Sequence, residues 1–319
     1  MRIKAPSPGV RARLLAVAIA LALPTLAAAQ TDTPPPILGR WDLHVNGPDG
    51  VYPSWLEATP SGNGYIVGRF VGRVGSARPI GRITWEQGTA RFAIPPQWEQ
   101  GTADVRFEGK LEGDRLVGTI TDPDGSEHAF TGTRAPALVH TAPQWGEPIA
   151  LFNGRDLAGW KTEGGESHWK VIDGVLTSTE SGANIVTEHE FTDFKLHVEF
   201  RYPEDGNSGV YLRGRYEVQV EDSPSREFPL SEDIGGVYGF LWPNENAATG
   251  PGTWQTYDIT LVGRRVTVVL NGHTVIADQL IPGPTGGALD SDEGEPGPIL
   301  LQGDHRPIEY RNIRLTPPR

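Results

Sequence analysis

The chain of 319 residues contains no cysteine. Catalysis by a cysteine nucleophile, zinc sites built on thiolates and iron–sulfur clusters are therefore excluded. Three other signatures are also missing: a glycine-rich phosphate loop, a Gly-x-Ser-x-Gly elbow and a His-Glu-x-x-His helix. Phosphoryl transfer, serine esterase chemistry and zincin chemistry thus have no support in the sequence.

Long hydrophobic runs are absent too, apart from the apolar stretch Leu14–Leu23. This stretch is too short to cross a bilayer, which needs roughly 20 residues. Four basic residues precede it and three alanines, ending at Ala29, follow it. The pattern predicts a secretory signal peptide over residues 1–29, cleaved near Ala29. We therefore expect an exported protein, periplasmic or secreted, without a transmembrane segment.

Basic residues are outnumbered: the chain has 28 Lys and Arg against 40 Asp and Glu, a formal charge of −12. Loss of the leader removes four basic residues and no acidic one, which leaves 24 against 40 and a net −16. Such a protein repels nucleic acids and anionic membranes. We expect no nucleic-acid partner and a substrate that is not a polyanion.

Glycine and proline are abundant, at 40 and 28 residues, and no stretch beyond the leader shows a helical period. Short strands joined by tight turns are typical of this composition, so an all-β protein is predicted. A Thr/Pro tail occupies 30–36. Six or more short strands over 37–134 predict a small β-barrel or sandwich similar to a lipocalin-like meander. A linker at 135–148 then leads to 149–319, where around a dozen strands predict a two-sheet jelly roll. Within 149–319, Asp-Gly and Asn-Gly pairs predict two tight hairpins, at Asp173 and Asn271.

Two neighbouring segments, Asn207–Arg213 and Tyr216–Val220, alternate with period two. Alternation sends successive side chains to opposite faces of a sheet. One polar face is thus predicted to carry four side chains: Tyr211, Arg213, Glu217 and Gln219. This combination is typical of a surface that binds a polyhydroxylated ligand and moves its protons.

Several ordered motifs resemble a known family. They are Leu151–Trp160, Trp169–Leu176, Asp193–Val220, Gly236–Gly239, Pro251–Tyr257, the Asn-Gly hairpin, Leu301–His305 and Glu309–Ile313. Over residues 149–316 the chain is similar to the 3-keto-disaccharide hydrolase domain family, which implies a concanavalin A-like jelly roll. The acidic stretch Asp290–Glu295 departs from the family pattern; we read it as a solvated loop rather than a calcium site, because its spacing does not match an EF-hand.

The resemblance implies a hydrolase or lyase that acts on a small-molecule or oligosaccharide glycoside oxidised at C3. A ketone at C3 acidifies the C2 proton; a base removes it, the aglycone leaves from C1, and water adds afterwards. This route needs a base, a group that stabilises the enediolate and a proton donor for the leaving oxygen.

Candidate residues follow from the predicted faces and loops. The catalytic candidates are Glu217 as base, His305 as acid and Arg213 as partner of the enediolate, with an ion pair to Glu217 as the alternative for Arg213. The substrate-binding candidates are Glu199, Gln219, Tyr211, Tyr238, Trp254 and Gln302. A divalent metal ion (Ca, Mn or Zn) is expected on Glu217, His305 and Asp304, and no organic cofactor is expected.

Two other functions stay open from the residues alone. Related jelly rolls also serve as non-catalytic carbohydrate-binding modules, and an ordinary glycosidase would act on unoxidised substrates. In the first domain, the tryptophans are expected to fill the core or form a lid. They are Trp41, Trp55, Trp85 and Trp98.

Overall fold

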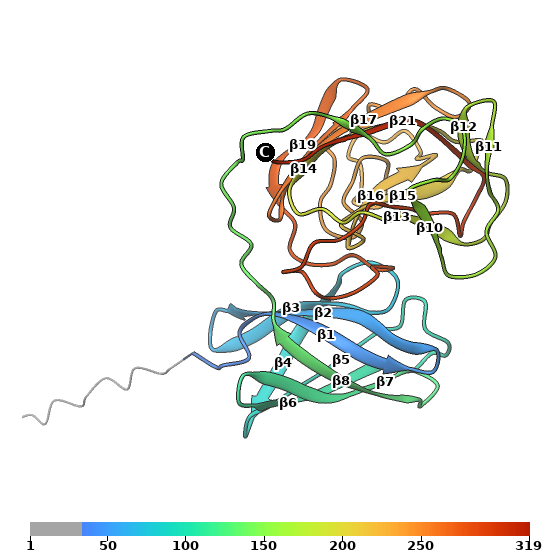
Figure 1. Ribbon diagram of the computed structural model, residues 1–319. Coiled ribbons are helices and arrows are strands. Elements are labelled where there is room, and N and C mark those ends of the chain that lie inside the picture. Colours follow the sequence, from blue (N-terminus) through green and yellow to red (C-terminus); the bar gives the residue numbers. More distant parts are fainter. Residues whose placement is uncertain (1–33) are drawn as a thin grey trace, which may run out of the picture. The chain divides into compact units, whose positions relative to one another are not determined.

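A computed structural model describes residues 34–319; the predicted signal peptide and most of the Thr/Pro tail lie outside the described residues (Figure 1). The described part contains 21 strands and no helix, so it has no helix that could span a membrane. Pro35–Arg319 form one compact unit. The predicted all-β class is confirmed.

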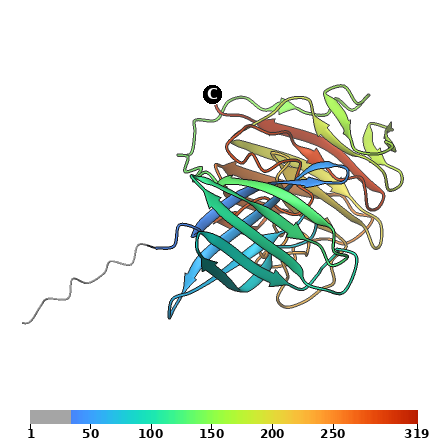
Figure 2. The same ribbon diagram turned by 90° about the horizontal axis from the view of Figure 1, so that it is seen from below.

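The first part of the chain is a closed antiparallel barrel (Figure 1, Figure 2). Each strand pairs with the next, and the first pairs with the eighth. The strands are β1 (Gly39–Gly47), β2 (Gly50–Ser61), β3 (Tyr65–Val71), β4 (Arg78–Glu86), β5 (Thr89–Ile94), β6 (Val105–Glu112), β7 (Arg115–Thr121) and β8 (Glu127–Arg134). Phe107 stacks on Phe92 and on Phe130, with ring centroids 4.7 Å apart in both pairs. Side chains thus fill the interior, as the small circumference of eight strands requires.

The second part is a β-sandwich. One sheet has the order β10-β13-β20-β15-β16, and the other has the order β11-β12-β21-β14-β17-β18-β19, with β9 paired to β21. The strands of the first sheet are β10 (Trp160–Glu163), β13 (Asn184–Thr187), β15 (Asn207–Leu212), β16 (Tyr216–Glu221) and β20 (Leu300–Leu301). Those of the second are β9 (Ile149–Ala150), β11 (Trp169–Ile172), β12 (Val175–Ser178), β14 (Phe194–Arg201), β17 (Gln255–Val262), β18 (Arg265–Leu270), β19 (His273–Leu280) and β21 (Ile308–Thr316).

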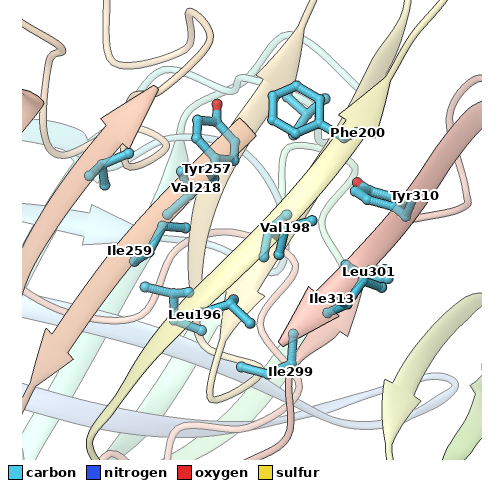
Figure 3. Packing of buried hydrophobic residues seen from close by; sticks show 14 of the residues in the cluster. Leu196, Val198, Phe200, Val218, Tyr257, Ile259, Ile299, Leu301, Tyr310 and Ile313 are labelled. Atoms are coloured by element: carbon cyan, nitrogen blue, oxygen red, sulfur yellow. The ribbon is translucent and has the colours of Figure 1, made fainter. Parts of the chain in front are cut away.

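The sandwich core lies between the two sheets (Figure 3). Val218 and Leu301 come from the five-stranded sheet, and Leu196, Phe200 and Tyr257 come from the other. All five side chains are buried. The predicted jelly-roll sandwich is therefore present. Because alternate side chains of each strand point into the core, the others form the opposite face of each sheet, where polar residues can lie.

The two predicted hairpins are correct. Asp173 and Gly174 have φ values of 51° and 81°, and Asn271 and Gly272 have φ values of 51° and 83°. Positive φ at both central residues is the signature of a type I′ turn. Two barrel strands escape prediction, β2 and β5. Prolines interrupt β2 and lower its strand propensity, whereas β5 has only six residues, and Ala93 at an exposed position hides the alternation that its burial shows.

The acidic stretch Asp290–Glu295 docks against the barrel rather than standing in solvent. Glu293 is 0% exposed; its carboxylate lies 3.2 Å from Arg40 Nη1 of β1 and accepts a 2.7 Å hydrogen bond from Tyr216. Asp42 of β1 is hydrogen-bonded to Glu293 as well. Burial, followed by the neighbouring Glu293 charge, raises the pKa of Asp42 to about 9. The reading of this stretch as a solvated loop is therefore wrong at Glu293.

Asp42→Asn is expected to stabilise the protein at alkaline pH. Because the pKa of Asp42 is raised on folding, the unfolded chain loses this proton first as pH rises, and stability declines between about pH 4 and about pH 9. The amide has no proton to lose, so the variant should be more stable than the parent at pH 8 and match it near pH 4. Urea unfolding of both proteins at both pH values measures this difference in stability. An identical pH dependence of the stability in parent and variant would contradict the raised pKa of Asp42.

Candidate active site

Strands β15 and β16 present a polar face away from the sandwich core. They pair antiparallel, with Tyr211 opposite Glu217 and Gly209 opposite Gln219. The alternate residues Val210 and Val218 belong to the core cluster. The predicted alternation is present, and it places Tyr211, Glu217 and Gln219 together on one surface.

Glu217 is a buried carboxyl at the centre of this surface, with 4% exposure. The Tyr211 hydroxyl lies 3.0 Å from Glu217 Oε2 and 3.1 Å from the Gly286 carbonyl. Burial raises the pKa of Glu217 to about 8, while the Tyr211 hydrogen bond and the charge of His305 act in the opposite direction. A carboxyl with such a pKa can both take and return a proton near neutral pH.

Gly209 makes room for the Glu217 side chain. A Cβ at this position would lie 2.3 Å from Glu217 Oε1 and 2.9 Å from its Cγ. The φ of Gly209 lies outside the left-handed region, so an alanine meets no backbone strain there. The absence of a side chain at Gly209 therefore leaves the space that the Glu217 side chain occupies.

Gly209→Ala is expected to lower the catalytic rate by at least about tenfold, because the new methyl group displaces a carboxylate that must be held to within about 0.5 Å. Gly81→Ala on β4 is the matched control, since its Cβ would have no atom within 4 Å. Steady-state kinetics and thermal unfolding of both variants measure the effect. Equal activity in Gly209→Ala and the parent would show that the position of Glu217 does not matter.

His305 and Asp304 form a pair beside Glu217. The distance from His305 Nδ1 to Asp304 Oδ1 is 2.6 Å. This hydrogen bond raises the pKa of His305, and the charges of Asp304 and Glu217 act in the same direction against partial burial. With Nδ1 held by the carboxylate, Nε2 is the nitrogen that can transfer a proton.

Two glutamines border the Glu217 surface. The backbone N–H of Gln302 donates to the Gly209 carbonyl at 3.0 Å. The Gln302 side chain is 8% exposed, and its Oε1 has no hydrogen-bond partner within residues 34–319. Gln219 Oε1 accepts from the Val220 N–H at 3.0 Å. A buried acceptor without a donor is unfavourable, and a ligand hydroxyl would satisfy it.

Tyr238 reaches the same surface from the loop after β16. Its backbone N–H donates to the Glu217 carbonyl at 3.1 Å. Burial, followed by the charge of Glu217, raises the pKa of Tyr238 to about 12. The indole of Trp98, from the barrel, lies close to this phenol and partly opposes the rise of its pKa. Trp98 is 64% exposed, so of the two predicted roles it does not fill the core, whereas Trp41 and Trp55 are fully buried.

Arg213 does not join Glu217. It has a left-handed backbone (φ 53°) in the turn after β15, which breaks the alternation. Its guanidinium is buried and donates to the Tyr216 hydroxyl at 2.9 Å and to the Glu293 carbonyl at 3.2 Å. The predictions of an enediolate partner and of an ion pair with Glu217 are both wrong, since Arg213 serves the packing against the acidic stretch.

Glu199 and Trp254 also lie apart from Glu217: Glu199 is on the other sheet, and Trp254 directly precedes β17 of that sheet. Glu199 belongs to β14; Arg311 Nε and Asn312 Nδ2 donate to it at 2.6 and 2.8 Å. The Trp254 ring centroid lies 3.9 Å from the Arg311 guanidinium carbon and 4.8 Å from that of Arg201. Glu199 and Trp254, both predicted to bind sugar, are thus engaged in ion-pair and cation–π contacts within the protein.

The residues predicted to hold a metal ion, Glu217, His305 and Asp304, do not form a ligand cluster as they stand, and the divalent metal stays a prediction. Within residues 34–319, no group of three or more His, Cys, Asp or Glu side chains is placed to hold a metal. Glu217 Oε2 is engaged by Tyr211, and Asp304 Oδ1 by His305. The donors assembled here suit proton transfer instead.

Comparison with known proteins identifies the family that the second part of the chain matches. A model of the 3-keto-alpha-glucoside-1,2-lyase-like domain matches residues 147–316. A curated relative, a 3-keto-disaccharide hydrolase of Bacteroides thetaiotaomicron, is 26% identical over 91 residues, which are 25% of this chain and 31% of the relative. The match therefore spans about a third of that protein's length.

Solved structures are similar to the sandwich. A Parabacteroides distasonis protein solved as a candidate glycosyl hydrolase shares 32% identity, covers 56% of this chain and 91% of its own, and has a TM-score of 0.46. The carbohydrate-binding module CBM66 of Bacillus subtilis shares 16% identity over 49% of this chain and 94% of its own, with a TM-score of 0.33. The family match extends over more than half of this chain, which therefore belongs to the 3-keto-alpha-glucoside-1,2-lyase-like domain family.

Proposed function

We propose that this protein cleaves glycosides whose sugar carries a ketone at C3, with Glu217 as the base. The observation that carries the proposal is the single buried carboxyl of pKa about 8, held by Tyr211 beside the His305–Asp304 pair. Ordinary glycosidases need two carboxyl groups that flank the scissile bond. Here the neighbouring Asp304 is tied to His305, and Glu221, also on β16, accepts a hydrogen bond from Ser223 at 3.3 Å, so Glu217 and His305 are the groups that we assign to proton transfer.

The proposed reaction begins with proton transfer. Glu217 takes the proton from C2, and the electron pair of that bond moves into the C3 carbonyl to form an enediolate. The amide N–H groups of Gln219 and Gln302 stabilise its oxygen, and Gln302 Oε1 accepts a sugar hydroxyl. Burial strengthens these hydrogen bonds because few water dipoles compete.

Elimination and hydration complete the cycle. The enediolate expels the aglycone from C1 while protonated His305 gives its proton to the leaving oxygen. Water then adds across the C1–C2 double bond: its oxygen joins C1 after His305 takes one proton, and Glu217 returns a proton to C2. Both groups regain their starting states, and the net change is hydrolysis.

Aglycone release from a matched pair of substrates tests the proposal. The pair is one glycoside and its C3-oxidised form, assayed with the purified protein with and without EDTA. We expect release from the oxidised form only, because an unoxidised sugar has no acidic C2 proton. Equal release from both forms would favour an ordinary glycosidase, and binding of both without release would favour a carbohydrate-binding module. Loss of activity in EDTA would support the expected divalent metal.

The pH profile of kcat/KM should be bell-shaped: it rises as Glu217, with a pKa of about 8, ionises, and it falls as His305 loses its proton. Tyr211→Phe removes the hydrogen bond that lowers the pKa of Glu217, so the rising limb should move to higher pH. Asp304→Asn removes the main cause of the raised His305 pKa and should move the falling limb to lower pH. Profiles between pH 6 and 10 measure both; an unshifted rising limb in Tyr211→Phe would contradict Glu217 as the base.

The leader-like segment supports an exported location, periplasmic or secreted. We propose that the mature chain begins near residue 30.

A further inference from the structure

The mouth of the barrel contains a cavity of about 300 Å³ that the proposed chemistry does not use. Its walls come from one end of the barrel, where β1, β3, β5 and β7 finish and β2, β4, β6 and β8 begin. The side chains that matter here are Tyr52, Arg73, Trp98, Asp122 and His128. Pockets that hold small ligands start at about this volume.

Two walls of the cavity continue to Glu217. On one side, the Arg73 carbonyl accepts the Gly287 N–H at 3.0 Å, and the Tyr211 hydroxyl that binds Glu217 lies 3.1 Å from the Gly286 carbonyl. The packing is tight, because a Cβ on Gly286 would lie 2.2 Å from the Gly75 carbonyl oxygen. The cavity and the catalytic surface therefore share this wall.

On the other side, Trp98 links the cavity to Tyr238, whose backbone N–H bonds the Glu217 carbonyl. The loop that carries Trp98 is firmly held. Glu99 Oε2 accepts the Gln97 and Trp98 backbone N–H groups at 2.8 and 3.2 Å, and Arg78 donates to the same carboxylate at 2.7 and 3.2 Å. A large apolar ring that stays exposed on a firmly held loop is a typical contact surface for a ligand.

The other walls supply polar groups of both kinds. His128 Nε2 lies 3.2 Å from Asp122 Oδ2, and the Arg73 guanidinium stands 5.7 Å from the centre of the Tyr52 ring. The lining thus combines donors, acceptors and aromatic rings, which suits a neutral ring that bears several hydroxyl groups. The strong net negative charge of the protein disfavours an anionic occupant.

We propose that the barrel mouth is the subsite for the leaving half of a disaccharide, with one sugar ring stacked on Trp98 while the oxidised ring lies over Glu217. This inference rests on the proposed function and adds a binding site for the departing sugar in the barrel, outside the matched family domain. The barrel is then part of the active site rather than a spacer.

Trp98→Ala tests the subsite with two substrates. One is a disaccharide oxidised at C3 of its non-reducing glucose, and the other is the methyl glycoside of the same oxidised glucose. We expect kcat/KM to fall at least tenfold for the disaccharide and less than twofold for the methyl glycoside, with partial recovery in Trp98→Phe. Tyr65→Ala is the control, because Tyr65 is exposed at the opposite end of the barrel. Equal losses on both substrates, or none on the disaccharide, would overturn the proposal.

A binding measurement separates this inference from the proposed function. Calorimetric titration with the unoxidised disaccharide and with methyl glucoside needs no turnover. Weaker binding of the disaccharide alone in Trp98→Ala and in His128→Gln supports the subsite even if no oxidised glycoside is cleaved. Unchanged disaccharide binding in both variants overturns it, whatever the activity of the parent protein.

Discussion

Glu217→Gln should lower kcat on a 3-keto-glycoside by about 10²–10⁴-fold while it leaves the affinity for the unoxidised glycoside within threefold. The amide keeps the size of the side chain and can still hydrogen-bond Tyr211, so the surface survives without its base. Single-turnover kinetics on the oxidised substrate and calorimetry with the unoxidised one measure the two effects separately.

The same variant should be more stable than the parent at pH 8. The pKa of Glu217 is raised on folding, so the stability of the parent falls as pH increases from about 4.5 to about 8. The neutral amide removes this decline. Lower activity together with higher stability marks a catalytic group, whereas a structural carboxylate would lose both. A variant that is less stable and binds sugar poorly would contradict the assignment of Glu217 as the base.

The second large effect concerns the leaving group. His305→Ala should lower kcat by about 10²–10³-fold for a 3-keto-disaccharide, whose departing alkoxide needs a proton. The loss should shrink to about tenfold or less for a 4-nitrophenyl 3-keto-glucoside, because 4-nitrophenolate leaves without protonation. Initial rates with the two substrates measure the difference.

The matched control is His197→Ala. His197 also pairs with an aspartate, Asp258 at 2.8 Å, but it lies on β14 of the other sheet. This variant should behave as the parent does on both substrates. If His305→Ala lost the same factor on the disaccharide and the nitrophenyl substrate, His305 would have a role other than protonation of the leaving oxygen.

Local pattern was sufficient to predict part of the candidate site. Alternation along β15 and β16 places Tyr211, Glu217 and Gln219 on one face, because core and surface residues must alternate in a strand that is covered on one side. The neighbouring Asp304 and His305 are adjacent in the chain, so their pairing needs no long-range information. Type I′ turns at Asp173 and Asn271 were predicted for the same reason.

Predictions failed where distant pairing or a single backbone angle decides the outcome. Arg213 leaves the predicted face because its φ is 53°, which alternation does not reveal. Glu199 follows the same period as a site residue, yet β14 joins the other sheet. Trp98 reaches Tyr238 only because the barrel packs against the sandwich, and no periodicity of the chain encodes that contact.

Proton exchange at C2 tests the central claim most directly. The parent and Glu217→Gln are each incubated in D₂O with a 3-keto-glycoside, and proton NMR follows the C2 signal and aglycone release. The proposed route predicts deuterium at C2 of the released 3-keto sugar from the parent and neither exchange nor release from the variant. Aglycone release by the parent at the same rate from substrates that carry protium or deuterium at C2, with the C2 hydrogen retained in the product, would contradict it, because the glycosidic bond would then break without proton abstraction.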